Sequence, residues 1–414
     1  MIPLRGLYNI LSHISWMVLQ LIALFNPKIN LFIQGRKRTK AILNSKSTDG
    51  KKVIWMHVAS LGEYEQGIPI LEKLRTHYPS YKIVLTFFSP SGYEIKKDTP
   101  YANMVVYLPM DTKSNAKRFL DSINPEMAIF VKYEIWPNYL HELKKRNISI
   151  LLVSAIFSNR QIFFKWYGGF MRNSLKAFAH FFVQDENSKK LLNSIGHNNV
   201  SISGDTRFDR VSKIKEQDNM LDFMDDFKNN RFCFVGGSTW PEGEKLLVEY
   251  INTTDHEVKF AIAPHNIKEG HINDLKNNLH KKSICFSELG EKSLADFEVL
   301  IVDTIGLLTK IYSYADLAYV GGGFATGLHN TLEPATFGVP IIIGPKFDGF
   351  KEAEDLVDKN GIHVVTVQSE FNDLMDKFIT DIDFRRKTGA INSSYVDINK
   401  GATAIIFDRL KTFL

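Results

Sequence analysis

Short apolar runs alternate with longer polar or amphipathic stretches from residue 51 onward. Seven runs in the first half are rich in Val, Ile and Phe: "KVIWMHVA", "YKIVLTFF", "MVVYLP", "MAIFV", "SILLVSA", "HFFVQ" and "VSISG". A second series of seven consists of "RFCFVGGS", "VKFAIAP", "SICFSE", "EVLIVD", "LAYVGGG", "PIIIGP" and "GIHVVTV". Apolar strands that alternate with helical patterns are typical of parallel sheets wrapped by helices. The pattern therefore predicts two Rossmann-like α/β halves.

A charge-rich stretch, residues 209–230, separates the two series and contains one weak helical pattern. We place the connection between domains there, because polar segments of this kind are typical of domain boundaries. The predicted parts are an N-terminal membrane-associating segment (1–42), an N-terminal Rossmann-like domain (43–210) and a C-terminal Rossmann-like domain (211–414). The last pattern, "NKGATAIIFDRLKTFL", predicts an amphipathic closing helix, and its packing back on the N-terminal domain is left open.

Residues 7–25 are apolar over about the length that spans a bilayer, but five polar side chains dilute the stretch. This stretch is compatible with a spanning helix, an interfacial helix or an amphipathic helix packed on a domain, and Pro27 ends it. Before residue 61 the chain carries nine Lys or Arg residues against one acid, and four of these cations lie in "GRKRTK" (35–40). The excess predicts attraction to the anionic surface of a membrane.

Composition excludes several classes of protein. Hydrophobic residues make up 44% of the 414 positions, which is enough for two ordinary cores. Cys233 and Cys285 lie in apolar runs without ligand spacing, which argues against a disulfide framework and against a zinc site. No secretory signal is recognisable. The cations lie beside apolar helix-formers and are not interleaved with aromatic residues, which argues against nucleic-acid binding.

Two carboxylates follow predicted strands in the first half. Glu63 stands after the turn "SLG", where a carboxylate either accepts backbone N–H groups at a helix start or acts as a general base. Gly62 would permit a tight turn that directs this side chain outward. Glu134, in "KYEIWPN", also follows a strand. It either pairs with a nearby cation or faces the same crevice as Glu63.

A glycine-rich stretch, "GGSTWPEGE" (236–244), follows the first strand of the second half. It predicts a turn whose free N–H groups and hydroxyls, from Gly237, Ser238 and Thr239, suit an oxyanion such as phosphate. The stretch lacks the Gly-Lys-Ser/Thr ending of a triphosphate-binding loop, and it also lacks GxGxxG. Neither an ATPase nor a dinucleotide-binding protein is therefore favoured.

The stretch "YVGGGFATGLHNTLEPATFGVPIIIGP" (319–345) carries three successive glycines after a predicted strand. Glycines permit the close approach of a ligand, and a helix is predicted to start near Asn330. Glu333 would lie in its first turn, placed to accept hydrogen bonds from the vicinal hydroxyls of a ribose. The arrangement suits a sugar nucleotide.

Five segments together resemble one family. "HVASLGEYEQG", "KYEIWPN", "SGDTRFD", "GGSTWPEGE" and "GGGFATGLHNTLEPATFGVPIIIGP" are similar, in order and spacing, to motifs of the 3-deoxy-D-manno-octulosonic acid (Kdo) transferases. The resemblance extends from near residue 35 to the final helix. It implies a GT-B fold, with two Rossmann-like domains facing a central cleft, and an inverting glycosyltransferase at the cytoplasmic face of the inner membrane. The implied partners are CMP-Kdo as donor, a lipid A precursor as acceptor and the membrane surface, without a cofactor.

The same resemblance implies roles for single residues. Glu63 matches the catalytic base of the Ser-x-Gly-Glu motif, with Ser60, Gly62 and Glu134 in support. The positions that match donor-binding residues of the family are Arg207, Gly237, Ser238, Thr239, His265, Gly322, Gly323, His329, Asn330 and Glu333.

Three positions depart from the family's pattern. Arg207 stands where the family carries a lysine, a change that keeps the charge and alters its geometry. The arginine of the family's Ala-Pro-Arg-His is absent, and His265 occupies or adjoins its place. Ile156 stands where an arginine is typical, although Arg160 lies four residues on. Either His265 or another cation is expected to meet the phosphate.

The implied reaction needs a single base. Glu63 would take the proton from an acceptor hydroxyl as its oxygen attacks the anomeric carbon of Kdo, and CMP would depart. The sequence has no Asp-x-Asp motif at a strand end, which agrees with a reaction that needs no metal. The nearest alternative is another GT-B enzyme that uses a different sugar nucleotide, such as a UDP-sugar. A two-domain solute-binding protein is a further alternative, which the missing signal disfavours.

Overall fold

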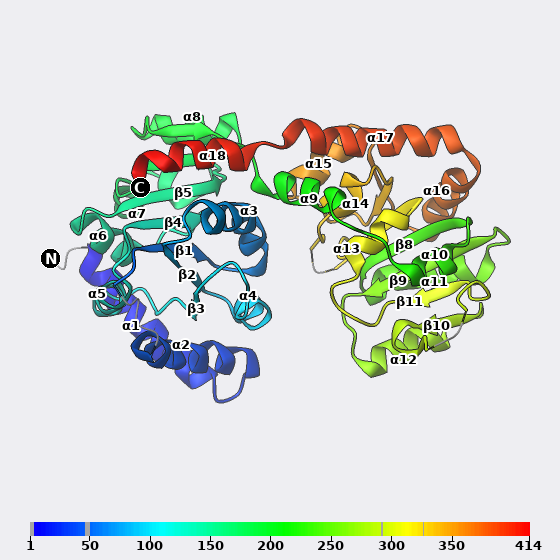
Figure 1. Ribbon diagram of the computed structural model, residues 1–414, viewed down its shortest axis with the longest axis horizontal. Coiled ribbons are helices and arrows are strands. Elements are labelled where there is room, and N and C mark those ends of the chain that lie inside the picture. The colour runs from blue at the N-terminus through cyan, green and yellow to red at the C-terminus, as the bar shows by residue number, and fades with distance from the viewer. Residues whose placement is uncertain (1–3, 46–49, 291–292, 326) are drawn as a thin grey trace. The chain divides into compact units, whose positions relative to one another are not determined.

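The computed structural model describes residues 4–45, 50–290, 293–325 and 327–414, so the first three positions of the predicted N-terminal segment lie outside it. The chain divides into two compact units. Unit 1 comprises Met1–Arg210 and Lys400–Leu414, and unit 2 comprises Val211–Asn399. Each unit is built on one sheet with helices packed against it (Figure 1).

Unit 1 contains a seven-stranded parallel sheet in the order β3-β2-β1-β4-β5-β6-β7. Its strands are β1 (Val53–Val58), β2 (Lys82–Phe87), β3 (Met104–Tyr107), β4 (Met127–Val131), β5 (Ser149–Ala155), β6 (His180–Val183) and β7 (Val200–Ile202). Its helices are α1 (Leu4–Ile22), α2 (Pro27–Ser45), α3 (Leu61–His77), α4 (Pro90–Lys96), α5 (Lys113–Ile123), α6 (Pro137–Lys145), α7 (Gly169–Leu175), α8 (Glu186–Ser194) and α18 (Ala402–Leu410). Helix α9 (Thr206–Glu216) begins in unit 1 and continues into unit 2.

Two cores lie on opposite faces of this sheet, because successive side chains of a strand point to opposite sides. Trp55 of β1 packs with α5 and α6 on one face, and Met56 packs with α3 on the other. The closing helix α18 adds Phe407 and Leu410 to the second core and lies beside α3 (Figure 1). The carboxylate of Asp209 accepts hydrogen bonds from the first N–H groups of α18. Burial on both faces explains why the strands are continuous apolar runs.

Helix α1 packs with its polar side toward unit 1. Tyr8 donates a hydrogen bond to Asp111 at 2.8 Å, and Asn9 accepts one from the N–H of Lys113 at 3.1 Å. The opposite side carries exposed apolar side chains at helical spacing, here called the apolar stripe of α1: Leu4, Leu7, Leu11, Ile14, Val18 and Leu21. No residue of α1 is buried. Among the helices that the structure describes, none is long and apolar enough to cross a membrane.

Unit 2 contains a second seven-stranded parallel sheet, in the order β10-β11-β9-β8-β12-β13-β14. Its strands are β8 (Phe232–Thr239), β9 (Val258–Pro264), β10 (Ser283–Cys285), β11 (Val299–Ile301), β12 (Leu317–Val320), β13 (Ile341–Ile343) and β14 (Ile362–Val364). Its helices are α10 (Asp222–Lys228), α11 (Pro241–Thr253), α12 (Glu269–Asn277), α13 (Leu308–Ile311), α14 (Leu332–Thr336), α15 (Lys351–Asp358), α16 (Gln368–Thr380) and α17 (Ile382–Asn399).

Each of the fourteen apolar runs contains one strand, and both sheets are parallel. The prediction of two Rossmann-like α/β halves is therefore confirmed. In each sheet the chain starts near the middle, fills one side and then crosses to the other. On the first side of unit 2, the edge strand β10 precedes β11 in the sequence, and β11 lies between β9 and β10. The order reverses between β1 and β4 in unit 1 and between β8 and β12 in unit 2. Open parallel sheets bind ligands beyond the carboxyl ends of strands at such reversal points.

Candidate active site

The predicted site residues gather at these two reversal points. Glu63 and Glu134 follow β1 and β4, the two strands that flank the reversal in unit 1. The stretches beginning at Gly237 and Gly322 end or follow β8 and β12, which flank the reversal in unit 2. Each unit thus carries part of the candidate set in the place where its sheet is suited to bind a ligand.

Glu63 is the third residue of α3, and its carboxylate turns back toward the preceding loop. Its Oε2 accepts a hydrogen bond from the N–H of Ala59 at 2.5 Å. Ser60 is the residue before the helix, and its side chain makes no capping hydrogen bond. The structural role expected of a carboxylate at a helix start is therefore present, and the Glu63 side chain is only 6% exposed.

The environment of Glu63 favours its protonated form. Burial is the largest cause that raises its pKa, to about 8, and the negative charge of Glu134 adds to the rise. The N–H of Ala59 and the charge of Lys132 act in the opposite direction. The two glutamates therefore lie close enough to interact, as the sequence predicts, and one carboxyl group has a pKa near working pH. A pKa near the operating pH is what a general base requires.

Glu134 is held by contacts with two aromatic side chains. The indole N–H of Trp136 lies 2.9 Å from Glu134 Oε2 and 3.1 Å from His57 Nε2, and His57 Nε2 lies 3.3 Å from Glu134 Oε2. The other ring nitrogen of His57 is 2.8 Å from the hydroxyl of Thr86. These contacts fix the orientation of Glu134. The sequence analysis missed His57, whose only signal is one polar residue inside the apolar run of β1.

Lys132 adopts a backbone conformation that is uncommon for a residue with a side chain. Its φ is +66°, and its N–H donates to the carbonyl of Val153 at 2.9 Å. It stands directly after β4 and two residues before Glu134. Non-glycine residues in the left-handed region often cluster at functional sites. The sequence offers no signal for this conformation, because it depends on pairing with the neighbouring strand.

The role predicted for Gly62 needs correction. This glycine lies inside the first turn of α3, it is not among the residues with positive φ, and a Cβ placed on it would meet no atom within 4 Å. The tight turn therefore does not require a glycine at this position. What the absence of a side chain provides is open space beside the helix start and next to Glu63.

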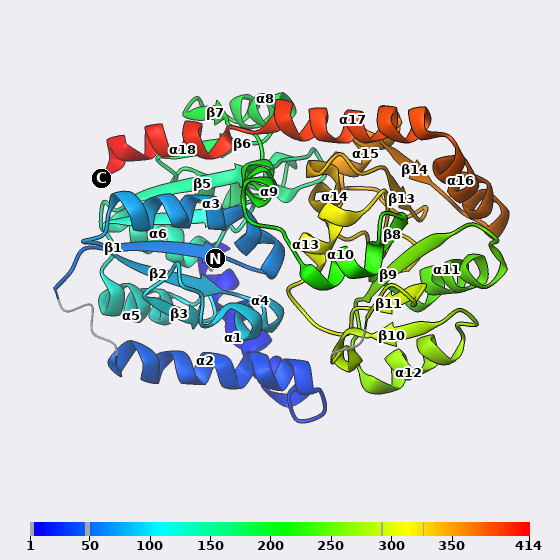
Figure 2. The ribbon, with the colours of Figure 1, turned by 45° about the vertical axis from the view of Figure 1, so that its right-hand side comes forward.

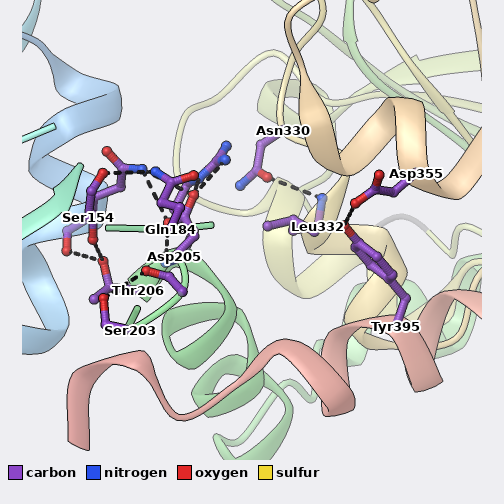
Figure 3. Close-up of polar contacts among 12 residues, drawn as sticks. Ser154, Gln184, Ser203, Asp205, Thr206, Asn330, Leu332, Asp355 and Tyr395 are labelled. Atoms are coloured by element: carbon purple, nitrogen blue, oxygen red, sulfur yellow. Dashed lines mark hydrogen bonds and ion pairs between the residues drawn. The ribbon is translucent and has the colours of Figure 1, made fainter. Parts of the chain in front are cut away.

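Arg207 lies in unit 1 and is already paired. Its Nε and Nη2 lie 2.9 and 2.8 Å from Oδ2 of Asp205, a carboxylate that also accepts hydrogen bonds from Gln66. Figure 3 shows Asp205 beside Thr206, whose hydroxyl lies 2.9 Å from that of Ser154. The guanidinium is therefore positioned by a buried carboxylate, and about a quarter of its side chain remains exposed.

The turn predicted at residues 236–239 is instead part of a strand. β8 continues to Thr239 because it pairs with β9 on one side and with β12 on the other. The hydroxyl of Thr239 donates to Glu244 at 2.7 Å, so it is not free for an oxyanion. Ser238 has a φ of +49° at the irregularity where the pairing with β9 shifts. A Cβ on Gly237 would lie 1.8 Å from the hydroxyl oxygen of Tyr312.

The glycines after β12 are required by packing within the chain itself. A Cβ on Gly322 would lie 2.1 Å from the carbonyl oxygen of Gly327, and Gly322 has a φ of +95°. A Cβ on Gly323 would lie 2.8 Å from the backbone of Gly344. Close backbone contacts are therefore enough to explain these glycines. The sequence alone predicts instead that they permit the close approach of a ligand.

Asn330 and Glu333 form a small hydrogen-bonded group. The side-chain amide of Asn330 donates to Glu333 at 3.1 Å, and the hydroxyl of Thr309 donates to the other carboxylate oxygen at 3.0 Å. Figure 3 shows Asn330 accepting from the N–H of Leu332. The helix begins at Leu332 and has only five residues, so its dipole is weaker than the sequence analysis assumes. Thr309 lies on α13, and no sequence signal connects it to Glu333.

Three aromatic rings stack beside the glycine stretch of unit 2. Trp240 lies parallel to His265 with ring centroids 4.7 Å apart, and its N–H donates to His329 at 3.0 Å. Burial lowers the pKa of His329 to about 4, and burial also lowers the pKa of His265. The neutral imidazole is therefore favoured at neutral pH in both residues. This disfavours His265 as the cation that replaces the missing arginine.

Lys346 is another cationic residue near the glycine stretch of unit 2. Its N–H donates to the carbonyl of Gly323 at 2.7 Å, and its side chain is exposed. The sequence analysis missed it, although "GPKFDG" directly follows the strand β13. Within the described residues, no group of three or more His, Cys, Asp or Glu side chains is placed to hold a metal ion.

Comparison with known proteins shows which family the chain resembles. The sequence profile described as 3-deoxy-D-manno-octulosonic-acid transferase (kdotransferase) matches residues 34–210, which end where unit 1 ends. A 3-deoxy-D-manno-octulosonic acid transferase from Haemophilus influenzae is 26% identical over 383 residues, or 87% of each chain. Another from Chlamydophila psittaci is 28% identical over 305 residues, which cover 71% of this chain and 69% of that protein. Over most of its length the chain is similar to Kdo transferases. It is therefore a glycosyltransferase.

Solved structures support the fold. A UDP-GlcNAc 2-epimerase from Neisseria meningitidis has a TM-score of 0.61 at 14% identity and covers 87% of this chain and all of its own. MurG from Acinetobacter baumannii has a TM-score of 0.56 at 12% identity, covering 87% of this chain and 99% of its own. At these identities the likeness establishes architecture alone. The predicted GT-B fold is confirmed.

Proposed function

We propose that this protein is a Kdo transferase that transfers Kdo from CMP-Kdo to a lipid A precursor, lipid IVA, with release of CMP and inversion at the anomeric carbon. The observation that carries the proposal is Glu63, a buried carboxyl group beyond the carboxyl end of β1 whose pKa is raised to about 8. Such a group holds a proton more tightly than an ordinary glutamate and is suited to take one from a sugar hydroxyl. Lipopolysaccharide assembly is the process this reaction would serve.

The neighbours of Glu63 support its role as the general base. Open space in front of Gly62 would admit the acceptor hydroxyl, and the unbonded side chain of Ser60 would orient it. Glu134, fixed by Trp136 and His57, would keep the charge near Glu63 that raises its pKa. These groups would align the acceptor oxygen for direct displacement at the anomeric carbon. One base and one direct displacement give inversion.

The donor would be held mainly by unit 2. Glu333, oriented by Asn330 and Thr309, would accept hydrogen bonds from the ribose hydroxyls of CMP-Kdo. The stacked rings of Trp240 and His265 would offer a flat surface to the cytosine base. Lys346, beside the carbonyl of Gly323, would stabilise the charge of the departing phosphate. Gly237, Ser238, Gly322 and His329 would shape the pocket around the nucleotide.

Membrane association is a further part of the proposal. The apolar stripe of α1 points away from unit 1 because the polar side of the helix bonds to Asp111 and Lys113. A helix that directs its apolar side outward suits the boundary between headgroups and acyl chains. The cations of residues 35–40 would face anionic headgroups on the cytoplasmic side of the inner membrane. This would place the lipid acceptor within reach of unit 1.

The decisive experiment counts products. Purified protein is given CMP-Kdo and tetraacylated lipid A precursor in detergent, and the products are measured by mass spectrometry. We expect a mass increase of one or more Kdo units together with free CMP. In a parallel competition, CMP should inhibit and UDP should not. Inhibition by UDP alone would instead favour a GT-B enzyme that uses another sugar nucleotide, and no product with CMP-Kdo would contradict the proposal.

A further inference from the structure

A cavity of about 550 Å³ lies in unit 1 among α1, α2 and α5, and none of the candidate active-site residues lines it. Its walls include Trp16 of α1, Arg36, Lys37 and Lys40 of α2, and Arg118 of α5. Figure 2 shows α2 running beside β3 and α5. The volume falls within the range of small-molecule pockets, and the walls combine cations with an indole ring. The cavity therefore suits a ligand that is both anionic and partly apolar.

Arg36 is buried without an acidic partner among the described residues. Its side chain packs on the rings of Phe32 and Phe88, with its central carbon 3.5 and 4.5 Å from the ring centroids. Its Nη atoms donate to the carbonyls of the same two residues, at 3.2 and 2.9 Å, and its buried Nε has no hydrogen-bond partner. Burial lowers the pKa of this guanidinium to about 9. A buried charge without a counterion is destabilising, so an anion in the adjoining cavity would relieve an existing cost.

The position of Arg36 is fixed by the residue before it. A Cβ on Gly35 would lie 2.1 Å from the Tyr107 ring, so only a glycine lets α2 approach β3 this closely. Thr39, one turn further along α2, donates to the carbonyl of Tyr107 at 3.1 Å. The helix is therefore locked against the sheet edge, and Arg36 is one of the residues that line the cavity.

The other cationic side chains that line the cavity have no acidic partner among the described residues, and the one acidic side chain that lines it is already paired. Arg118 bonds only to neutral groups, the carbonyl of Ser114 and the side chain of Asn115. Lys37 and Lys40 are exposed and form no ion pair with any residue that the structure describes. Asp121 is the one acid among the lining residues, and it is paired with Arg146 at 2.7 Å. The cavity therefore carries a net positive charge that the chain itself leaves open.

An apolar surface adjoins this charge. Trp16 connects the cavity to α1, whose apolar stripe is exposed along the same helix. Indole rings are enriched where membrane headgroups meet acyl chains. A lipid whose headgroup enters the cavity could therefore keep its acyl chains beside the stripe. A soluble anion would use the cations and leave the apolar surface without a function.

We infer that this cavity binds the phosphate headgroup of an anionic bilayer phospholipid, held by Arg36, Lys37, Lys40 and Arg118. The inference rests on the membrane association in the proposed function and is independent of Kdo transfer. The site would fix the rotation of α1 and α2 on the membrane surface, because one headgroup would be held at a defined point. It would be separate from the residues around Glu63 that are proposed to meet the acceptor.

The test separates a pocket from diffuse attraction. One variant, Lys37→Gln/Lys40→Gln, removes two cations of the cavity, and Lys189→Gln/Lys190→Gln on α8 removes the same charge elsewhere in unit 1. A third variant, Ser122→Trp, fills the cavity and keeps every cation, since Ser122 lines it and is exposed. Binding is measured to vesicles of phosphatidylcholine with and without phosphatidylglycerol, and to dihexanoylphosphatidylglycerol below its micelle concentration. Circular dichroism and thermal unfolding show that each variant is folded.

We expect saturable binding of the short-chain lipid, weakened about tenfold or more by Lys37→Gln/Lys40→Gln and by Ser122→Trp, and unchanged in the α8 variant. Transfer to the acceptor in detergent should remain in all three variants, which separates this inference from the proposed function. Retained lipid binding in Ser122→Trp would show diffuse attraction only and overturn the inference. Equal competition by inorganic phosphate, or binding of the lipid A precursor in place of phosphatidylglycerol, would overturn it as well.

Discussion

Around the carboxyl ends of β1 and β4, unit 1 gathers buried carboxyl groups, whereas around those of β8 and β12, unit 2 gathers glycines and aromatic rings. Glu63 is nearly inaccessible and has a pKa of about 8 because it is buried near Glu134. In unit 2, burial keeps His265 and His329 neutral at neutral pH, and Gly322 is surrounded by backbone. In the proposed reaction, unit 1 would move a proton and unit 2 would hold a flat, polar ligand.

The difference teaches that a shared sheet topology fixes where a site lies and leaves its chemistry to the loops. Both reversal points lie between the first strand of the unit and its neighbour on the other side, β1 and β4 or β8 and β12. A Trp-Pro pair follows a strand at both points, but Glu63 is found only in unit 1 and the run of three glycines only in unit 2. A helix begins soon after the first strand in both units, but α3 carries the buried Glu63 in its first turn, whereas α11 follows the ring of Trp240. The division of labour is therefore a property of a few loop residues, and single substitutions can test it.

The largest expected effect comes from Glu63→Gln. This change keeps the shape of the side chain and removes its ability to accept a proton, so transfer should fall by about 10²-fold or more. Binding of CMP, measured by calorimetry, should be unchanged because the donor is assigned to unit 2. Glu63→Asp is the control that keeps the acid at a shorter reach and should retain more activity than Glu63→Gln. Full activity in Glu63→Gln would contradict the assignment of Glu63 as the general base.

Two glycine substitutions, one in each unit, compare the local packing around Gly322 with that around Gly62. Gly322→Ala places a Cβ 2.1 Å from the carbonyl of Gly327 at a φ of +95°, and it should lower the free energy of unfolding by about 1–3 kcal/mol. Gly62→Ala meets no atom within 4 Å, and its stability should change by less than about 1 kcal/mol. Thermal unfolding of both variants measures the contrast. If Gly62→Ala nevertheless impairs transfer, the open space beside Glu63 is used by the acceptor.

Local signals account for what the sequence could predict. Strands buried on both faces are continuous apolar runs, so all fourteen could be located, and the loops carrying Glu63, Glu134 and Glu333 followed from their ends. The extension of β8 to Thr239 could not be predicted, because "GGST" is typical of a turn and only pairing with β9 and β12 makes it a strand. Local propensity was overridden there by neighbours distant in sequence.

Partners that lie far apart in sequence account for most of the remaining differences. Thr309 meets Glu333, Trp240 meets His329, and His57 meets Glu134 only because parallel strands bring their ends together. The orientation of α1 is another example. Its periodicity predicts an amphipathic helix, but only the bonds of Tyr8 and Asn9 to unit 1 show that the polar side faces inward. Periodicity defines two faces and does not say which one is buried.

The pH dependence of transfer should reveal the coupling inside unit 1. The proposed reaction would need the deprotonated form of Glu63, so the rate should rise with pH and reach half its plateau near pH 8. Glu134→Gln removes a negative charge that raises this pKa, so the midpoint should move to lower pH. Lys132→Asn removes a positive charge that lowers it, so the midpoint should move to higher pH. Shifts in the same direction for both variants would contradict the electrostatic explanation.

Stability provides a test of the same pKa that does not depend on activity. The folded protein keeps the proton of Glu63 up to about pH 8, whereas the unfolded chain releases it near 4.5. The folded state therefore binds more protons between these values, and this contribution to stability is lost as the pH rises. The midpoint temperature of thermal unfolding of the wild type should therefore fall between pH 4.5 and about 8, relative to that of Glu63→Gln. Parallel curves would mean that Glu63 titrates normally.

The smallest effect is expected at Arg207, the residue that tests whether the division between the units is strict. It lies in unit 1 beside Asp205, yet it is assigned to the donor. Arg207→Ala should raise the KM for CMP-Kdo by about tenfold, the loss of roughly one charge-assisted hydrogen bond, with kcat little changed. Arg207→Lys should change the KM for CMP-Kdo by less than about threefold, because a lysine keeps the charge at this position. If neither variant affects KM, Arg207 serves only to order the loop around Asp205, and donor recognition belongs to unit 2 alone.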